Sequence, residues 1–191
     1  MKKGLLIVVS GPSGCGKGTI LTEILKDEKY YFSVSATTRT PREGEVNGVN
    51  YHFLSRKTFE NLIASGGMLE YAEYCNNYYG TPSKEVGSMR EKGLDVILEI
   101  EVQGAMQVKE ICPDAVLIFI APPSLSELEW RLRKRGTESE ELIAKRVAEA
   151  VRELEYTSKY NYIIVNGDLD KAVDDFREVV RTEELKIGHS Y

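Results

Sequence analysis

Residues 4–19, GLLIVVSGPSGCGKGT, combine glycines, a lysine and hydroxyl side chains in a spacing that can bind phosphate groups. The apolar run Leu5–Val9 predicts a buried strand, a loop with three glycines follows it, and a helical pattern begins after Lys17. Glycines allow backbone N–H groups to approach phosphate oxygens closely, and the positive end of a helix dipole strengthens that attraction. The stretch predicts a phosphate-binding loop whose lysine reaches β- and γ-phosphates, although a plain glycine-rich turn would share its composition.

The residue after this lysine departs from the usual pattern GxxxxGK[ST]. Gly18 takes that place, and the hydroxyl comes one residue later, at Thr19. In many nucleotide triphosphatases the first hydroxyl binds Mg²⁺ directly. We therefore expect Thr19 or a water molecule to substitute here, and we note that a GKGT ending occurs among nucleoside monophosphate kinases.

The composition indicates a globular protein with one substantial core. The chain has 191 residues, of which 42% are hydrophobic and 29% charged. It contains no apolar run of about 18 residues, and its short apolar start continues directly into the glycine loop, so neither a membrane span nor a signal peptide is predicted. The net charge of −5 argues against non-specific nucleic-acid binding. The scattered cysteines, Cys15, Cys75 and Cys112, suggest neither a metal site nor disulfides, which predicts a reducing, cytoplasmic compartment.

Strand and helix patterns alternate along most of the chain. Short apolar runs at Val96–Ile100 and Val116–Ile120 predict strands that are buried on both faces of a parallel sheet, and Tyr162–Val165 predicts a last buried strand. The predicted helices are Thr19–Lys26, Val102–Ile111, Leu125–Arg135, a long helix from a capping box at Thr137 to about Lys159, and a last helix capped by Asp168. This alternation predicts a parallel α/β sheet with ligands at the carboxyl ends of its strands.

The segment 33–91 differs, because short strands and helices surround a polar loop. The expected elements are strands at Tyr31–Ser35, Tyr51–Leu54 and Met68–Tyr74, a helix capped by Ser55, and a helix that opens at Thr81-Pro82. The loop of residues 36–50 is long for a compact domain, which favours a functional role. We therefore expect a mixed α+β insertion in the parallel domain.

Six motifs, in order along the chain, resemble those of guanylate kinases. They are SVSATTRTPREGEVNGVNYHF, EYAEYCNNYYGTP, ILEIEVQGA, FIAPPS, RGTES and IIVN. The resemblance covers nearly the whole chain. It implies the α/β fold of P-loop nucleoside-phosphate kinases, with a parallel central sheet flanked by helices. It also implies transfer of the γ-phosphoryl group from ATP, bound with Mg²⁺, to GMP and also to dGMP.

The same resemblance implies a division of the chain into three parts. Residues 1–32, 92–123 and 147–191 would form the core domain that binds ATP. Residues 33–91 would bind GMP, and residues 124–146 would form a short helical lid. Because water in the cleft would hydrolyse ATP, we expect the last two parts to close over both substrates.

The resemblance assigns GMP to the inserted segment. Arg39 and Arg42 suit a phosphate, because a guanidinium makes forked, charge-assisted bonds to it. Glu70 matches the residue that reads guanine, since a carboxylate accepts the N1–H and N2–H₂ donors together, whereas adenine would leave it unpaired. The expected GMP-binding residues are Ser35, Arg39, Arg42, Tyr51, Glu70, Tyr79, Thr81 and Glu101.

The resemblance assigns ATP to the glycine loop and the chemistry to basic side chains. The expected ATP-binding residues are Gly11, Pro12, Ser13, Gly14, Cys15, Gly16, Lys17, Gly18, Thr19, Arg131 and Asn166. The expected catalytic residues are Lys17, Arg39, Arg135 and Arg146, and those for Mg²⁺ are Thr19 (through water), Glu99 and Glu101. Two alternatives stay open: Asn166 would equally suit a helix cap, and the two glutamates would equally suit strand-end caps.

Two other functions fit parts of the pattern. A guanylate-kinase-like interaction module would bind phosphopeptides without catalysis, but such modules typically have a degraded phosphate loop, and this one retains Lys17. A monophosphate kinase for another base, such as AMP or UMP, is disfavoured by Glu70. The expected partners are therefore ATP and GMP, with no nucleic acid, membrane or obligate protein partner.

Overall fold

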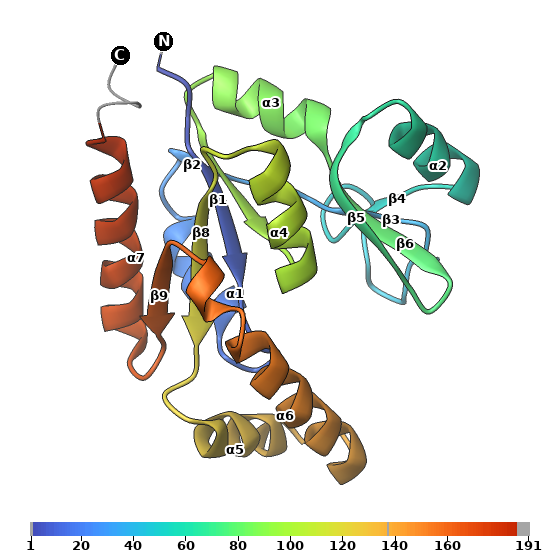
Figure 1. Ribbon diagram of the computed structural model, residues 1–191. Helices are drawn as coiled ribbons and strands as arrows, with labels where there is room; N and C mark the ends of the chain where they lie inside the picture. Colours follow the sequence, from blue (N-terminus) through green and yellow to red (C-terminus); the bar gives the residue numbers. More distant parts are fainter. Residues whose placement is uncertain (1, 137, 187–191) are drawn as a thin grey trace.

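Two β-sheets organise the protein (Figure 1), for which a computed structural model describes residues 2–136 and 138–186. A five-stranded sheet has the order β2-β7-β1-β8-β9, and a four-stranded sheet has the order β4-β3-β6-β5. Within the described residues, none of the helices combines the length and apolar character that a membrane crossing needs. The larger sheet is parallel throughout and is flanked by helices, which confirms the predicted fold class.

The inner strands of the larger sheet owe their apolar runs to burial on both faces. The five strands of this sheet are β1 (Leu6–Ser10), β2 (Tyr30–Phe32), β7 (Asp95–Glu99), β8 (Val116–Ala121) and β9 (Tyr162–Val165). Every residue of β1 and of β8 is buried. Neither strand has a face in water, so neither alternates between apolar and polar residues. The last strand, Tyr162–Val165, lies at an edge and leaves Ile163 and Val165 exposed, so the expectation that it is buried was wrong for this strand.

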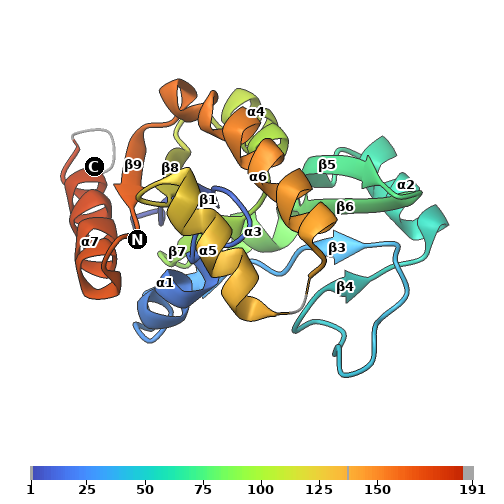
Figure 2. The same ribbon diagram turned by 90° about the horizontal axis from the view of Figure 1, so that it is seen from below.

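Helices cover both faces of this sheet (Figures 1 and 2). One face packs against α1 (Lys17–Ile24) and α7 (Leu169–Glu184), and the other packs against α3 (Ser83–Glu91) and α4 (Val102–Ile111). Connections that contain a helix bring each strand back parallel to its neighbour. The carboxyl ends of β1, β7 and β8 therefore lie at the same edge of the sheet.

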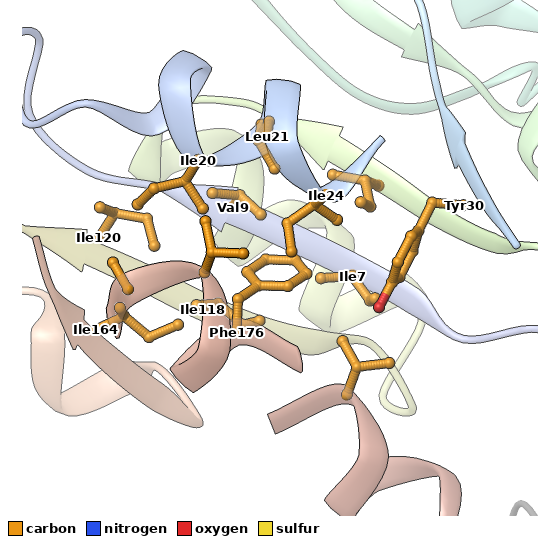
Figure 3. Close-up of a cluster of buried hydrophobic side chains, with 14 of the residues drawn as sticks. Ile7, Val9, Ile20, Leu21, Ile24, Tyr30, Ile118, Ile120, Ile164 and Phe176 are labelled. Atoms are coloured by element: carbon orange, nitrogen blue, oxygen red, sulfur yellow. The ribbon is translucent and has the colours of Figure 1, made fainter. Parts of the chain in front are cut away.

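The two helical layers divide the side chains of β1 between them. Ile7 and Val9 belong to the cluster with α1 and α7, whereas Leu6 and Val8 belong to the cluster with α3 and α4. Figure 3 shows the first cluster, in which the ring of Phe176 from α7 lies among isoleucines of the sheet and of α1. Alternation along the strand thus anchors the start of the glycine loop from both sides.

The smaller sheet is built from shorter strands. They are β3 (Ala36–Thr37), β4 (His52–Phe53), β5 (Met68–Tyr74) and β6 (Asn77–Pro82), covered by α2 (Arg56–Ala64). Its buried cluster centres on only Ala36, Phe59 and Met68. The β5–β6 hairpin turns through Cys75 and Asn76, which both have positive φ (48° and 62°), as a tight two-residue turn requires.

A helical pair, α5 (Leu125–Arg135) and α6 (Glu140–Leu154), lies beyond the carboxyl end of β8 (Figure 1). The two helices pack on each other through buried aliphatic side chains. These are Leu128, Leu132, Ile143 and Ala150. A short 3₁₀ helix, Thr157–Lys159, then leads to β9.

Several boundaries differ from those expected. β6 was not predicted, because its sequence NYYGTP contains Gly and Pro, and only pairing with β5 and β3 makes it a strand. The helix expected at Thr81-Pro82 begins after that strand, at Ser83. Helix α6 ends at Leu154 rather than near Lys159, and Ser139 caps it by accepting the Leu142 N–H at 3.3 Å. The cap predicted at Thr137 lies outside the described residues.

Candidate functional site

The glycine loop connects β1 to α1 as predicted, and two of its glycines are sterically required. Gly16 has a left-handed backbone (φ 93°), and a Cβ there would lie 2.2 Å from Nδ2 of Asn166. A Cβ on Gly11 would lie 2.1 Å from the carbonyl oxygen of Ile120 on β8. Only residues without a side chain let the loop backbone fit this closely against the sheet, with its following N–H groups at the start of α1.

Asn166 and Arg131 support the loop from behind. The Asn166 side chain donates to the carbonyl oxygen of Cys15 at 2.8 Å, and Arg131 donates to the carbonyl oxygen of Asn166 at 3.0 Å. Asp168, and not Asn166, caps α7, so the capping alternative for Asn166 was wrong. Burial raises the pKa of the Cys15 thiol, which keeps it protonated as a packing residue.

A cavity of about 490 Å³ opens over the loop and contains the predicted lysine. It is lined by Ser13, Gly14, Gly16, Lys17, Gly18, Thr19, Thr22, Glu23, Glu99 and Arg135. Nζ of Lys17 donates to the carbonyl oxygens of Gly11 at 2.6 Å and Pro12 at 3.2 Å, and lies 4.0 Å from Oε1 of Glu99. The ammonium group is thus held at the cavity wall, where an anion over the loop would meet it.

A second cavity, of about 520 Å³, lies between the smaller sheet and the start of α4. Its lining includes six of the eight residues predicted for GMP: Ser35, Arg42, Tyr51, Glu70, Tyr79 and Glu101. The other lining residues are Ala72, Tyr74, Gly80, Glu99, Ile100, Gln103, Gly104 and Arg146. Arg39 and Thr81, the two remaining residues predicted for GMP, contact members of the lining from behind.

Glu70 is the most deeply placed charge of this second cavity. Its side chain accepts a hydrogen bond from Oγ1 of Thr81 at 2.7 Å, and the residue is only 6% exposed. Burial raises the pKa of Glu70 above its ordinary value, the Thr81 hydrogen bond opposes that rise, and the nearby charge of Glu101 adds to it. One carboxylate oxygen therefore has a partner, and the carboxylate as a whole is suited to paired donors from a ligand.

A basic and aromatic cluster adjoins this cavity, which Arg42 and Tyr51 line. Arg39 makes a forked ion pair with Glu45, at 2.8 and 2.9 Å, and its guanidinium faces the ring of Tyr51 at 5.6 Å. Glu45 also accepts the N–H of Arg42 at 2.7 Å, and these two contacts lower its pKa. Sequence reasoning missed Glu45, although an acidic residue within a basic loop is a signal for such a pair.

Two side chains join the cavities. Glu99, at the end of β7, lines both of them. Arg146 of α6 lines the second cavity, donates to Oγ of Ser13 in the loop at 2.6 Å, and pairs with Glu138. Of the four residues predicted to be catalytic, Lys17, Arg135 and Arg146 therefore surround the loop, while Arg39 lies in the basic cluster.

Two of the three candidates for Mg²⁺ share one cavity. The Thr19 hydroxyl and the Glu99 carboxylate both line the cavity over the loop, whereas Glu101 lines only the second one. Oxygen donors of this kind fit Mg²⁺, which keeps several waters and binds through few protein ligands. Among the described residues no group of three or more His, Cys, Asp or Glu side chains could hold a metal by itself, so a nucleotide's phosphates would have to complete the site.

The parallel sheet, its glycine loop and the adjoining second cavity place the protein among the P-loop kinases of small molecules. A family model described as guanylate kinase matches residues 3–183. The chain is 50% identical to a guanylate kinase of Clostridium tetani (98% of this chain, 90% of that protein) and 52% identical to one of Desulfitobacterium hafniense (96% and 92%). The chain belongs to the guanylate kinase family.

A solved structure extends this agreement to three dimensions. The crystal structure of guanylate kinase from Anaplasma phagocytophilum is similar with a TM-score of 0.78 and 34% sequence identity, covering 98% of this chain and 90% of that one. The similarity spans both sheets and the helical pair, because nearly the whole chain is covered. The resemblance read from the six motifs is therefore confirmed.

Proposed function

We propose that this protein transfers the γ-phosphoryl group of ATP to GMP, giving ADP and GDP. The observation that carries the proposal is Glu70, a buried carboxylate with one hydroxyl partner in a cavity that shares Glu99 with the cavity over the glycine loop. A guanine edge supplies the adjacent N–H donors that such a carboxylate needs, and adenine does not. Membership of the guanylate kinase family supports the same reaction.

The donor nucleotide binds through backbone more than through side chains. We assign the phosphates of ATP to the N–H groups at the start of α1 and to the ammonium of Lys17. Arg131 and Asn166 act by holding the loop backbone in place, as their bonds to Cys15 and to each other indicate. In this assignment, the residues that line the cavity bind the phosphates and do not distinguish one base from another.

The acceptor binds through side chains of the inserted segment. We assign the GMP phosphate to Arg39, Arg42, Tyr51 and Tyr79, and the base to Glu70. Thr81 orients the Glu70 carboxylate, and Ser35 and Glu101 lie on the same wall. We expect dGMP to serve as an acceptor as well.

Transfer places one phosphate end to end with another. An oxygen of the GMP phosphate forms the new bond to the γ-phosphorus, the bond to the bridging oxygen breaks, and ADP leaves with that electron pair. The acceptor is already an anion, so no general base is required. Lys17, Arg135 and Arg146 stabilise the transferred charge from the loop side and Arg39 from the acceptor side. Arg146 is suited to this because it reaches both cavities.

Mg²⁺ would be held by ATP together with Thr19 and Glu99, directly or through water, whereas Glu101 faces GMP. When bound, the ion neutralises charge on the donor phosphates. This chain's contribution is to present two oxygen donors beside the glycine loop without a preformed metal cage. A weak site of this kind suits an ion that arrives and leaves with its nucleotide.

We also propose that residues 33–91 form the GMP-binding region and that residues 124–146 form a lid, with the rest as the core. Closure would exclude water, and Ser13–Arg146 is the contact that would join lid and loop. Helix α6 runs without a break through residue 146, so its later turns would move with the lid or bend. We expect the reaction to take place in the cytoplasm.

The proposal is tested by ADP release from purified protein with ATP, magnesium and each of GMP, dGMP, AMP, UMP and CMP. We expect turnover with GMP and dGMP only, and identification of GDP as product. Turnover with AMP or UMP would contradict the role of Glu70. Absence of turnover with every acceptor, together with phosphopeptide binding, would favour an interaction module instead.

A further inference from the structure

The strand that carries Glu70 lies at the edge of the smaller sheet. On its open side, it makes hydrogen bonds to one side chain of helix α4. β5 pairs only with β6 in the smaller sheet. On its open side, the N–H of Tyr71 donates to Oε1 of Gln107 at 3.2 Å, and Nε2 of Gln107 donates to the carbonyl oxygen of Tyr71 at 3.2 Å. The carboxamide thus occupies both backbone groups of one residue, as a neighbouring strand would.

Gln107 belongs to α4, which packs along β5 (Figure 2) and begins shortly after β7 of the central sheet. Three residues earlier on the same face of α4 is Gly104. A Cβ on Gly104 would lie 2.8 Å from Oε2 of Glu70 and 3.2 Å from its Cδ. The Glu70 carboxylate is therefore enclosed between the backbone of α4 on one side and the Thr81 hydroxyl on the other.

From this geometry we infer that Gln107 is a positioning residue for guanine recognition. Its two bonds set the register of β5 on α4, and that register places Glu70 against Gly104 at the wall of the second cavity. The residue contacts no reacting atom and acts through Glu70. Without these bonds, an edge strand that pairs on one side would be free to shift by fractions of an ångström. A carboxylate that accepts hydrogen bonds from two adjacent N–H groups of guanine tolerates little displacement.

The inference rests on the proposed function, since it concerns how GMP is read. It also has a consequence for the proposed division of the chain. The base-reading wall is assembled from β5 of the inserted segment and from α4 of the core, so the two cannot separate at this point without breaking the Gln107 bonds.

Three variants and one control test this role. Gln107→Leu removes both bonds at similar volume, and Gln107→Glu keeps the acceptor for the Tyr71 N–H but loses the donor. Gly104→Ala puts a methyl group against Glu70 while leaving Gln107 in place. Glu110→Gln, an exposed change on the same helix, is the matched control.

For Gln107→Leu we expect the KM for GMP to rise about tenfold with the KM for ATP changed less than about twofold, and Gln107→Glu to lie between this variant and the wild type. The preference for GMP over IMP, which lacks the 2-amino group, should fall about tenfold as well. Hydrogen exchange at the Tyr71 amide should accelerate in Gln107→Leu and stay unchanged in Glu110→Gln. A residue that merely stabilised the fold would lower Tm without altering the preference between GMP and IMP.

Gly104→Ala separates recognition from stability. Alanine favours a helix over glycine, so Tm should hold or rise, while the displaced Glu70 should raise the KM for GMP. This variant tests the placement of Glu70 against α4 even if both Gln107 variants fail to fold. Unchanged GMP kinetics in Gly104→Ala or in Gln107→Leu, or equal losses for ATP and GMP, would overturn the inference. A wild-type protein that makes no GDP would instead overturn the proposed function, before any variant is compared.

Discussion

The two cavities differ in how they are made. The cavity over the glycine loop comes mainly from one continuous stretch of chain, and the sheet behind it is buried on both faces. The second cavity draws residues from the loop before β4, from β5, β6, the end of β7 and two helices, and its sheet has a small core. A backbone cradle needs only correct local geometry, whereas recognition by side chains needs several elements to be placed together.

The two cavities should therefore respond differently to substitutions. In the proposed function, phosphates are bound by backbone N–H groups, which every residue except proline supplies, so we expect the loop to depend on its glycines and one lysine. In the same proposal, the base is distinguished from other bases by the side chain of Glu70, which has supporting contacts from Thr81 and α4. Changes in the loop should abolish transfer with any acceptor, and changes in the second cavity should alter which acceptor is used and how tightly.

Lys17→Ala should give the largest effect. Removal of the ammonium group leaves the transferred charge without its loop-side partner, and we expect kcat to fall by about 10³ or more. Tm should be nearly unchanged, because among the described residues the Lys17 side chain contacts only carbonyl oxygens of its own loop and a partly exposed glutamate. Steady-state kinetics and a thermal melt measure both quantities, and near-normal turnover would refute the assigned role.

Glu70→Gln should come next, with a loss of about 10² in kcat/KM for GMP and little change in ATP binding. An amide offers one acceptor where guanine needs two, and its NH₂ group would face the guanine donors. If ATP and GMP binding weaken equally, the assignment of Glu70 to the base is wrong. Isothermal titration with each nucleotide separates these cases.

Glu70 also predicts a pH dependence. Its pKa is raised by burial, so GMP binding should weaken on acidification at a higher pH than for an exposed glutamate. The free energy of unfolding should change in the opposite direction from GMP binding. Because the folded state favours the protonated carboxyl, Glu70 lowers the free energy of unfolding as pH rises from the pKa of the unfolded state through that of the folded state. Glu70→Gln should therefore have a higher Tm than wild type at pH 7, and the gap should close towards low pH.

Arg39→Lys should have a smaller effect. Lysine cannot make the forked pair with Glu45, so we expect the KM for GMP to rise about tenfold with ATP affinity retained. The exposed pair Arg133–Glu129 on α5 offers a control, since Arg133→Lys should change neither nucleotide's KM. A loss of ATP affinity in Arg39→Lys would show that the two cavities are less separate than we describe.

Cys75→Asn should have the smallest effect, and on stability alone. Cys75 has a left-handed backbone at the tip of the β5–β6 hairpin, a conformation that asparagine adopts more readily. We expect the free energy of unfolding to rise by about 1 kcal/mol in urea denaturation, with both KM values unchanged. Altered GMP kinetics would mean that the hairpin tip influences the second cavity, which would sharpen its dependence on the whole sheet.

Much of the larger sheet was readable from local pattern. Leu5–Val9, Val96–Ile100 and Val116–Ile120 match β1, β7 and β8 within a residue or two, because strands buried on both faces must be continuously apolar. The smaller sheet was harder: β3 and β6 were not predicted, since two residues of Ala36–Thr37 and the Gly-Pro-containing β6 carry no strand pattern of their own. They become strands only through each other and β5.

The residues that hold the candidate site in place were the least predictable. Gln107 and Gly104 lie on a different element from the side chains that they face, so their positions in the sequence do not reveal these contacts. Glu45 is an exception, because it lies in the same loop as Arg39 and Arg42 and could have been found there. Asn166 was expected near ATP, yet its bond to the Cys15 carbonyl across 151 positions identifies it as a support for the loop. Contacts of this kind exist only once the strands are ordered.

By itself, the amino-acid sequence determined the glycine loop, the parallel strands and the six family motifs, because each depends on residue types within a short stretch. The tertiary structure decided that Glu99 and Arg146 reach both cavities and that Glu70 is enclosed by Thr81 and α4. The physical reason is that burial and hydrogen-bond geometry depend on which distant elements pack together, and local sequence carries that information only indirectly.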